Sequence, residues 1–144
     1  MRTKLNIFAF LTLVILLYGC ITIPMPENKV LSGERITDEQ IVFIEEGTTS
    51  KAEVEDHLGQ PNVHLVDRNI YAYDWQTRQA IMIWAISNGY QGSVGAIDIP
   101  KNYIFLIRFD AQDRVTHYEI TTRSLLESYG DHVMEWIHAD EKAQ

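Results

Sequence analysis

The chain has 144 residues, of which 46% are hydrophobic and 22% are charged, and its formal net charge is −8. These values predict one domain with a hydrophobic core and exclude a largely disordered chain. The acidic balance argues against nucleic acid as the main partner, because phosphate groups repel it. The single cysteine excludes an intramolecular disulfide and any metal cluster built on several cysteines.

Residues 1–19 have the pattern of a signal peptide. Arg2 and Lys4 precede an apolar run from Ile7 to Tyr18 that only one threonine interrupts. A basic start followed by about a dozen apolar residues is typical of a secretory signal. The run is too short for a membrane-spanning helix, which needs roughly 20 apolar residues.

The run ends in Leu-Tyr-Gly-Cys, which resembles the lipobox of bacterial lipoproteins. The resemblance implies cleavage before Cys20, a diacylglycerol on its thiol and an acyl chain on its new amine, with no other cofactor. Ile21 follows instead of aspartate, which in enteric lipoproteins implies a lipid anchor on the periplasmic side of the outer membrane. Cleavage removes Arg2 and Lys4 and no acid, so the net charge becomes −10 and the acyl chains must provide the attachment. An ordinary signal peptide with a chance cysteine is the alternative.

Residues 20–35 are expected to form a lipidated tether. Pro24 and Pro26 and the weak periodicity of this segment favour an extended conformation. The segment also holds more apolar side chains than a spacer needs. Docking of the segment on a partner, or on the surface of its own domain, is therefore the alternative to a linker.

A short helix is predicted at residues 38–45, where a folded domain spanning 36–123 begins. Thr37 and Gln40 have the spacing of a capping box, in which each side chain bonds the backbone N–H of the other residue. Gly47 is expected to end this helix, because glycine adopts a left-handed cap at little cost.

A second helix is predicted at residues 51–58. Ser50 and Glu53 form a second capping box at its start. Gly59 is expected to end the helix, and Pro61 prevents its resumption.

The hydrophobic period then changes to two, which predicts three or four antiparallel strands. The expected strands are residues 70–75, 80–86, 103–109 and 115–121. The polar turn at 110–113 should join the last two strands into a hairpin. Segment 80–86 is apolar on both faces, as in a central strand. The glycine-rich residues 87–102 are expected to form a long loop.

Residues 124–144 are predicted to form a C-terminal helix and tail. Ser124 and Glu127 have the spacing of a third capping box. The apolar residues behind them recur at helical spacing and indicate an amphipathic helix. They are Leu126, Tyr129, Val133, Trp136 and Ile137.

Residues 44–61 resemble the start of the SmpA/OmlA family of small outer-membrane lipoproteins, which includes BamE of the barrel-assembly machinery. The matching positions are Gly47, Thr48, Val54, Leu58, Gly59 and Pro61, followed later by Phe109-Asp110 and Arg114-Val115. The resemblance implies an α+β fold with two short N-terminal helices packed on a sheet of three or four antiparallel strands, similar to half of the beta-lactamase inhibitor protein. These motif residues specify the fold more than the function.

The sequence predicts neither an active site nor a metal site. The five histidines lack the spacing of paired metal ligands, and no serine lies in a nucleophile elbow. Aromatic side chains are the more promising functional groups, because tyrosine and tryptophan often anchor protein interfaces. The candidate partner-binding residues are Trp84, Tyr90, Tyr103 and Trp136.

The expected function is that of a non-enzymatic outer-membrane lipoprotein facing the periplasm. By resemblance, it would be an accessory subunit in outer-membrane protein assembly or envelope integrity, with envelope proteins such as the barrel-assembly machinery as partners. The alternative is a periplasmic inhibitor that plugs the cleft of an enzyme of the lysozyme or beta-lactamase class.

Overall fold

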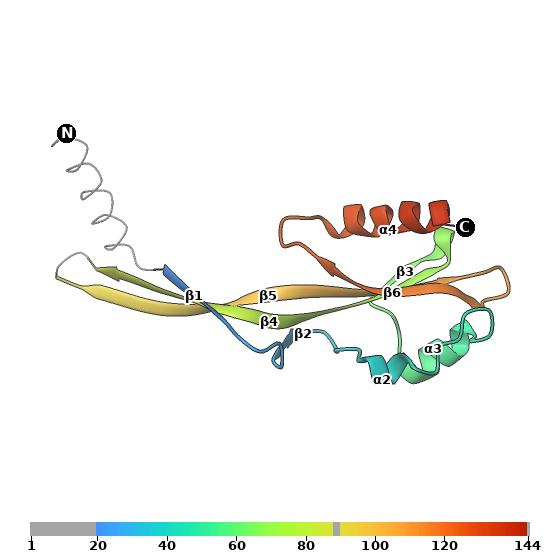
Figure 1. Cartoon of the computed structure of the whole chain (residues 1–144), viewed down its shortest axis with the longest axis horizontal. Helices are drawn as coiled ribbons and strands as arrows, with labels where there is room; N and C mark the ends of the chain where they lie inside the picture. Colours follow the sequence, from blue (N-terminus) through green and yellow to red (C-terminus); the bar gives the residue numbers. More distant parts are fainter. Residues whose placement is uncertain (1–19, 88–89, 144) are drawn as a thin grey trace. The chain divides into compact units, whose positions relative to one another are not determined.

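The computed structural model describes residues 20–87 and 90–143 (Figure 1). The expected signal peptide, residues 1–19, lies outside the described residues. The elements in chain order are β1 (Cys20–Pro24), β2 (Val30–Ser32), α2 (Asp38–Ile41), α3 (Lys51–Leu58), β3 (Val63–Leu65), the 3-10 turn η1 (Val66–Arg68), β4 (Ile70–Ser87), β5 (Gly92–Phe109), β6 (Val115–Arg123) and α4 (Tyr129–Ala143).

The prediction of a sheet of three or four strands carrying two helices is wrong. Over the described residues the antiparallel sheet has six strands, in the order β1-β4-β5-β6, and β2 and β3 also pair with β4. Two of the additional strands, β1 and β2, lie within the expected tether. Their pairing partner is distant in sequence, so the local pattern of residues 20–35 could not reveal it.

Two expected strands, 70–75 and 80–86, form one strand of 18 residues, β4. No glycine or proline separates them, so nothing in the backbone interrupts the pairing. Most of the expected loop 87–102 belongs to β5, although this stretch contains Pro100. The register of β5 with β6 begins only at Asn102, so β5 has no β6 partner at Pro100, and edge positions of this kind are where strands tolerate proline. The predicted hairpin at 103–121 is confirmed.

The chain forms two compact units. The hairpin unit comprises residues 20–27 and 78–99, and so contains β1 and the adjoining parts of β4 and β5. The core unit comprises residues 28–77 and the chain from 100 onward, and contains the other elements.

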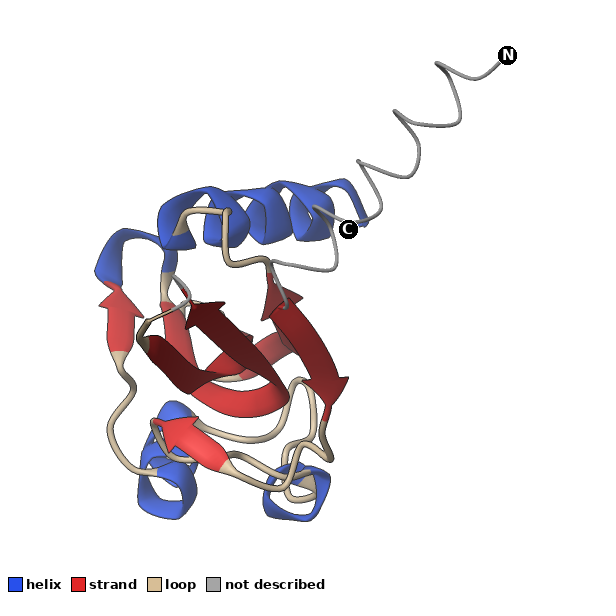
Figure 2. Ribbon diagram, turned by 90° about the vertical axis from the view of Figure 1, so that its left-hand side faces the viewer, coloured by secondary structure: helices blue, strands red, loops and turns tan. Residues whose placement is uncertain are grey.

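In the core unit, helices cover both faces of the sheet, with α4 on one side and the two short helices on the other (Figure 2). Alternate residues of β4 serve the two faces, as the two-residue period of a strand requires. Tyr71, Tyr73 and Trp75 belong to the cluster beside the short helices, with Val54 of α3. Ile70 and Ala72 belong to the cluster beneath α4, which supplies Val133, Trp136 and Ile137. The core unit therefore has three layers and two apolar clusters.

The predicted bounds and caps of the second helix are confirmed by α3. Ser50 Oγ accepts a hydrogen bond from the backbone N–H of Glu53, whose carboxylate accepts one from the Ser50 N–H at 2.7 Å. Gly59 ends the helix at φ 76°, in the region that favours glycine.

The first helix has the predicted capping box, but it is shorter than predicted. It ends at Ile41, whereas residue 45 was expected. The buried Thr49 explains the difference, since its hydroxyl accepts from the Glu45 N–H at 2.8 Å and donates to the Phe43 carbonyl at 3.1 Å. In a helix that reached residue 45, the Glu45 N–H would bond the Ile41 carbonyl, and the Thr49 hydroxyl takes this N–H instead.

The third capping box is not the start of α4, which begins at Tyr129. Ser128 caps it, because its hydroxyl accepts a hydrogen bond from the Asp131 N–H at 3.1 Å. The Glu127 carboxylate bonds His132 at 3.0 Å, and Leu126 is exposed instead of joining the apolar stripe. No helix in residues 20–87 or 90–143 combines the length and apolar character needed to cross a membrane.

Candidate functional site

Cys20, the predicted lipidation site, is the first residue of β1 and carries an exposed free thiol. β1 runs antiparallel to β4, with Cys20 opposite Trp84 and Ile21 opposite Ile83. The cysteine is thus part of the sheet of the hairpin unit, and no spacer separates the two. A group attached to Cys20 would lie directly beside the β1–β4 pair.

Apolar side chains dominate the exposed surface of the hairpin unit. Directly paired residues of an antiparallel sheet share a face, so Ile21 and Ile83 lie on the same side. The exposed large hydrophobic residues of this unit are Ile21, Ile23, Ile83, Ile86, Tyr90, Val94 and Ile97. Ile86 is three residues beyond Ile83 in β4, so it lies on the opposite face, and the unit exposes apolar side chains on both faces. Exposed apolar surface on a soluble domain usually marks an interaction site.

Charged residues are almost absent from the hairpin unit. Residues 20–26 and 79–97 contain no acidic, basic or histidine side chain. The three charged residues of the unit are Glu27, Arg78 and Asp98, and Arg78 Nη1 lies 3.6 Å from Asp98 Oδ1. The strand segments 20–24, 79–87 and 92–97 therefore carry no charged residue.

Of the four candidate partner-binding residues, Trp84 and Tyr90 lie in the hairpin unit. The Trp84 ring packs on Gly95, where a Cβ would overlap the indole. Tyr90 is 99% exposed. The predicted candidate set left out the exposed isoleucines and Val94, although the charge-free run 79–97 was a visible signal.

The other two candidates, Tyr103 and Trp136, lie in the core unit. Tyr103 stacks on Trp75, with ring centroids 5.3 Å apart. Trp136 is buried, and its indole N–H donates to Glu119 Oε2 at 2.8 Å. Both rings contribute to packing within the core unit.

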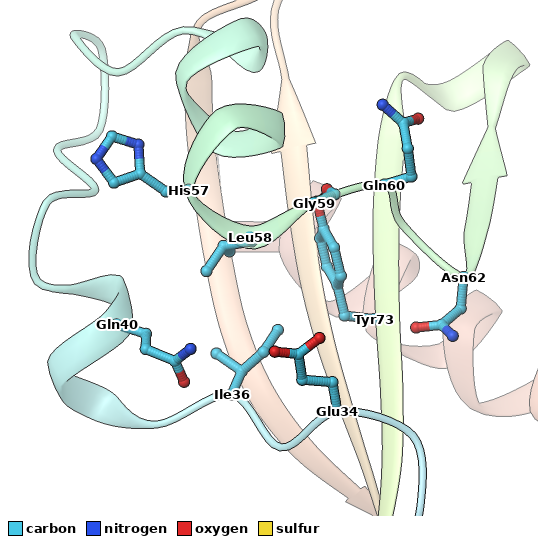
Figure 3. Close-up of a pocket in the computed structure, with 9 residues that line it drawn as sticks. All are labelled: Glu34, Ile36, Gln40, His57, Leu58, Gly59, Gln60, Asn62 and Tyr73. Carbon is cyan, nitrogen blue, oxygen red and sulfur yellow. The ribbon is translucent and has the colours of Figure 1, made fainter.

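A polar pocket of about 310 Å³ opens in the core unit between the short helices and β4 (Figure 3). Gln40, Gln60 and Asn62 supply amides to its lining, and Glu34 supplies a carboxylate. The Tyr73 hydroxyl donates to the Gly59 carbonyl at 3.0 Å. Burial, with a further contribution from the charge of Glu55, raises the pKa of Tyr73 far above its usual range. The phenol is therefore neutral at physiological pH, and the lining contains no serine, cysteine or lysine nucleophile.

A second pocket, of about 410 Å³, lies beside α4. Asp140 is buried and pairs with Arg108 of β5, with Nη1 and Oδ2 2.5 Å apart. The His117 ring stacks on Trp136 at 5.6 Å, and its Nδ1 lies 3.3 Å from Glu46. The Asp140–Arg108 pair thus joins α4 to β5, and the His117–Glu46 contact joins β6 to the loop before α3.

Thr121, His132 and Glu127 form a hydroxyl–imidazole–carboxylate series. Thr121 Oγ1 lies 2.8 Å from His132 Nε2, and His132 Nδ1 lies 3.0 Å from Glu127 Oε1. The order is that of a nucleophile, a base and an orienting acid. However, Thr121 sits inside β6 in register with Ile104, and its hydroxyl is also 3.4 Å from the Ile104 carbonyl. We interpret the series as a set of structural hydrogen bonds that joins β6, the turn between β6 and α4, and α4 itself.

Among the described residues, no group of three or more histidine, cysteine, aspartate or glutamate side chains is arranged to hold a metal ion. Comparisons of the chain with protein-family models, with curated proteins and with solved structures found no match.

Proposed function

We propose that this chain is a lipid-anchored protein of the bacterial envelope that acts by binding other proteins. The observation that carries the proposal is Cys20, which follows Leu-Tyr-Gly after an apolar run and whose thiol is exposed at the start of β1. An exposed cysteine at this point is open to acylation, and two or more acyl chains give stable anchoring. The proposed location is the periplasmic side of the outer membrane.

Contacts with proteins are the proposed mode of action, because the polar clusters of the core unit are committed to its own packing. The acidic and basic residues of the mature chain lie in the core unit, except for Glu27, Arg78 and Asp98. A charged, folded unit held at a membrane is suited to binding a neighbouring envelope protein. The resemblance in residues 44–61 suggests the barrel-assembly machinery as the partner to test first.

The anchor is tested with Cys20→Ser in cells labelled with palmitate. The wild-type protein should carry the label and sediment with membranes, whereas the variant should lose the label and leave the membrane fraction. Thr22→Ser, in the same strand, is the matched control and should behave like the wild type. Labelling that survives in Cys20→Ser would refute the anchor.

The partner is tested by affinity purification of the lipidated protein from detergent-solubilised membranes. Recovery of a barrel-assembly component in stoichiometric amount supports the assembly role. Its absence, with palmitate labelling intact, overturns that role and leaves the anchor in place.

An inhibitor of a periplasmic enzyme is the second candidate, favoured by the almost fully exposed Tyr90. An aromatic side chain presented in this way can enter an enzyme cleft. Soluble protein carrying Cys20→Ser would be assayed against lysozymes and beta-lactamases, with Tyr90→Ala as the comparison. Inhibition that depends on Tyr90 would support this candidate, and lack of inhibition would reject it for both enzyme classes.

A further inference from the structure

We propose that the hairpin unit is a membrane-contact surface whose strands lie in the interfacial layer of the bilayer that holds the acyl chains of Cys20. The inference rests on the proposed lipid anchor and extends it from one residue to a whole unit. Its occupant is a phospholipid bilayer, and a protein partner is the competing outcome of the test.

The position of Cys20 brings the sheet to the bilayer. Acyl chains on Cys20 depart from a strand residue that is paired with Trp84. The distance between the anchor and the sheet is therefore a side-chain length, whereas an anchor on a flexible linker would leave the domain free. Trp84 shares the face of Cys20, and the next pair, Ile21 and Ile83, exposes apolar side chains on the opposite face.

The distribution of charge within the hairpin unit fits a membrane contact. Glu27 and Arg78 lie beyond the end of the β1–β4 pair where Pro24 meets Ala80, and Cys20 lies at the opposite end. From that charged end, β4 continues without a charge through Ser87, and β5 is uncharged from Gly92 to Ile97. Charges disfavour entry into a bilayer, and here they are confined to one end of the strands.

The aromatic residues of the hairpin unit are also of the types expected at a membrane contact. Trp84 and Tyr90 are the types enriched where bilayers meet water, because each has an apolar ring and a polar group. Trp84 rests on Gly95 and is partly exposed, and Tyr90 is fully exposed. Both are therefore accessible to lipid.

The sheet itself limits the depth of the contact. β1 is the first strand in the sheet order and pairs with β4 on one side, so its outer backbone groups need water or lipid headgroups. Ser87, Gln91 and Ser93 add polar side chains to the same unit. The contact is thus interfacial and does not span the bilayer.

Quenching of tryptophan fluorescence by brominated lipid tests the proposal. The lipidated full protein would be reconstituted into phosphatidylcholine vesicles that contain phospholipid with dibrominated acyl chains. Trp75 and Trp136 are 3% and 6% exposed within the core unit, so Trp84 is the tryptophan open to lipid. Part of the emission should be quenched in the wild type, and Trp84→Phe should abolish that part. Equal fractional quenching in the two proteins would overturn the proposal.

Two variants of matched exposure provide a second measurement. Val94 of the hairpin unit is 80% exposed and Val42 of the core unit is 79% exposed. In protein made unlipidated by Cys20→Ser, Val94→Lys should weaken partition into neutral phosphatidylcholine vesicles by up to about fivefold, as for a lysine near the bilayer interface. Val42→Lys should leave partition unchanged, and equal effects of the two lysines would contradict the proposal.

Palmitate labelling separates this inference from the anchor. Labelling together with quenching of Trp84 supports both. Labelling without that quenching keeps the anchor, overturns the membrane contact and assigns the apolar surface to a protein partner. Quenching without labelling refutes the anchor and supports a contact made by the strands alone.

Discussion

The hairpin unit and the core unit share two long strands, yet those strands have opposite environments in the two units. In the core unit, β4 and β5 are covered on both faces, and residues such as Ile70 and Phe105 are fully buried. In the hairpin unit the same strands expose Ile86 and Val94. Strand residues of one chemical class are therefore core in one unit and surface in the other, depending on whether the chain supplies helices to cover them.

Charge follows the same division. From residue 20 onward, the core unit carries all the acidic and basic residues except Glu27, Arg78 and Asp98. Charged side chains keep a unit soluble, so the core unit has the surface of a water-exposed domain. The hairpin unit has an apolar surface that needs another environment. Under the proposed membrane contact, stability in water and contact with a neighbour would belong to different parts of the chain.

The largest expected contrast lies between two isoleucines of β5. Ile107 is fully buried in the core unit, and Ile97 is 50% exposed in the hairpin unit. Ile107→Ala should lower the free energy of unfolding by about 2–5 kcal/mol, because it leaves a cavity. Ile97→Ala should change it by about 0.5 kcal/mol, as for a surface substitution. Urea unfolding followed by fluorescence measures both, and equal losses would break the distinction between the units.

The ion pairs offer a second contrast, of smaller size. Asp140 is buried with Arg108, so Asp140→Ala should cost about 3 kcal/mol by leaving the guanidinium uncompensated. The Arg78–Asp98 pair is more exposed and longer, so Asp98→Ala should cost about 0–1 kcal/mol. Thermal and urea unfolding of the two variants test this. Recovery of stability when Arg108→Met is added to Asp140→Ala would show that the unpaired guanidinium of Arg108 causes the loss.

Within the hairpin unit, Gly95 sharpens the comparison. Gly95→Ala places a methyl group against the Trp84 ring and should cost about 1–3 kcal/mol as the ring moves. Gly92→Ala is the control, because its Cβ would meet its nearest neighbour at an ordinary 3.7 Å. The emission of Trp84 should change only in Gly95→Ala. A Trp84→Phe background should reduce the cost, and an unchanged cost would mean that the indole is not the obstacle.

The sequence was most informative where structure is set by neighbouring residues. The bounds of α3 follow from Ser50, Glu53 and Gly59, all within or beside the helix, and they were predicted correctly. The hairpin of β5 and β6 likewise follows from a local polar turn. The first helix was predicted too long, because the bonds that end it come from Thr49, beyond the segment.

Long-range pairing was not predictable in this way. Pro100 and the neighbouring glycines were interpreted as a loop, since only the strand order shows that this part of β5 is an edge. The strand β1 was missed because its partner, Ala80 to Trp84, is remote in sequence. Which candidate aromatic residues are buried was not predictable either, because burial of Trp136 depends on α4 packing against the sheet. The lipidation prediction at Cys20 depends on a continuous motif and stays a prediction.

Acidic pH should lower the stability of the core unit through α3, and this is the smallest of the expected effects. Hydrogen bonds from the backbone N–H and the hydroxyl of Ser50 lower the pKa of Glu53 below its ordinary value of 4.5. Because the pKa is lower in the folded state, this carboxylate stabilises α3 fully above about pH 4.5, and the stabilisation is lost as the pH falls through the folded value. Glu53→Gln should therefore flatten the dependence of stability on pH below 4.5. Ser50→Ala removes the hydroxyl bond and keeps the backbone bond, so it should flatten the slope less than Glu53→Gln. Urea unfolding at several acidic pH values measures both, and a slope in Glu53→Gln equal to that of the wild type would mean that the capped helix is not the source of the acid sensitivity.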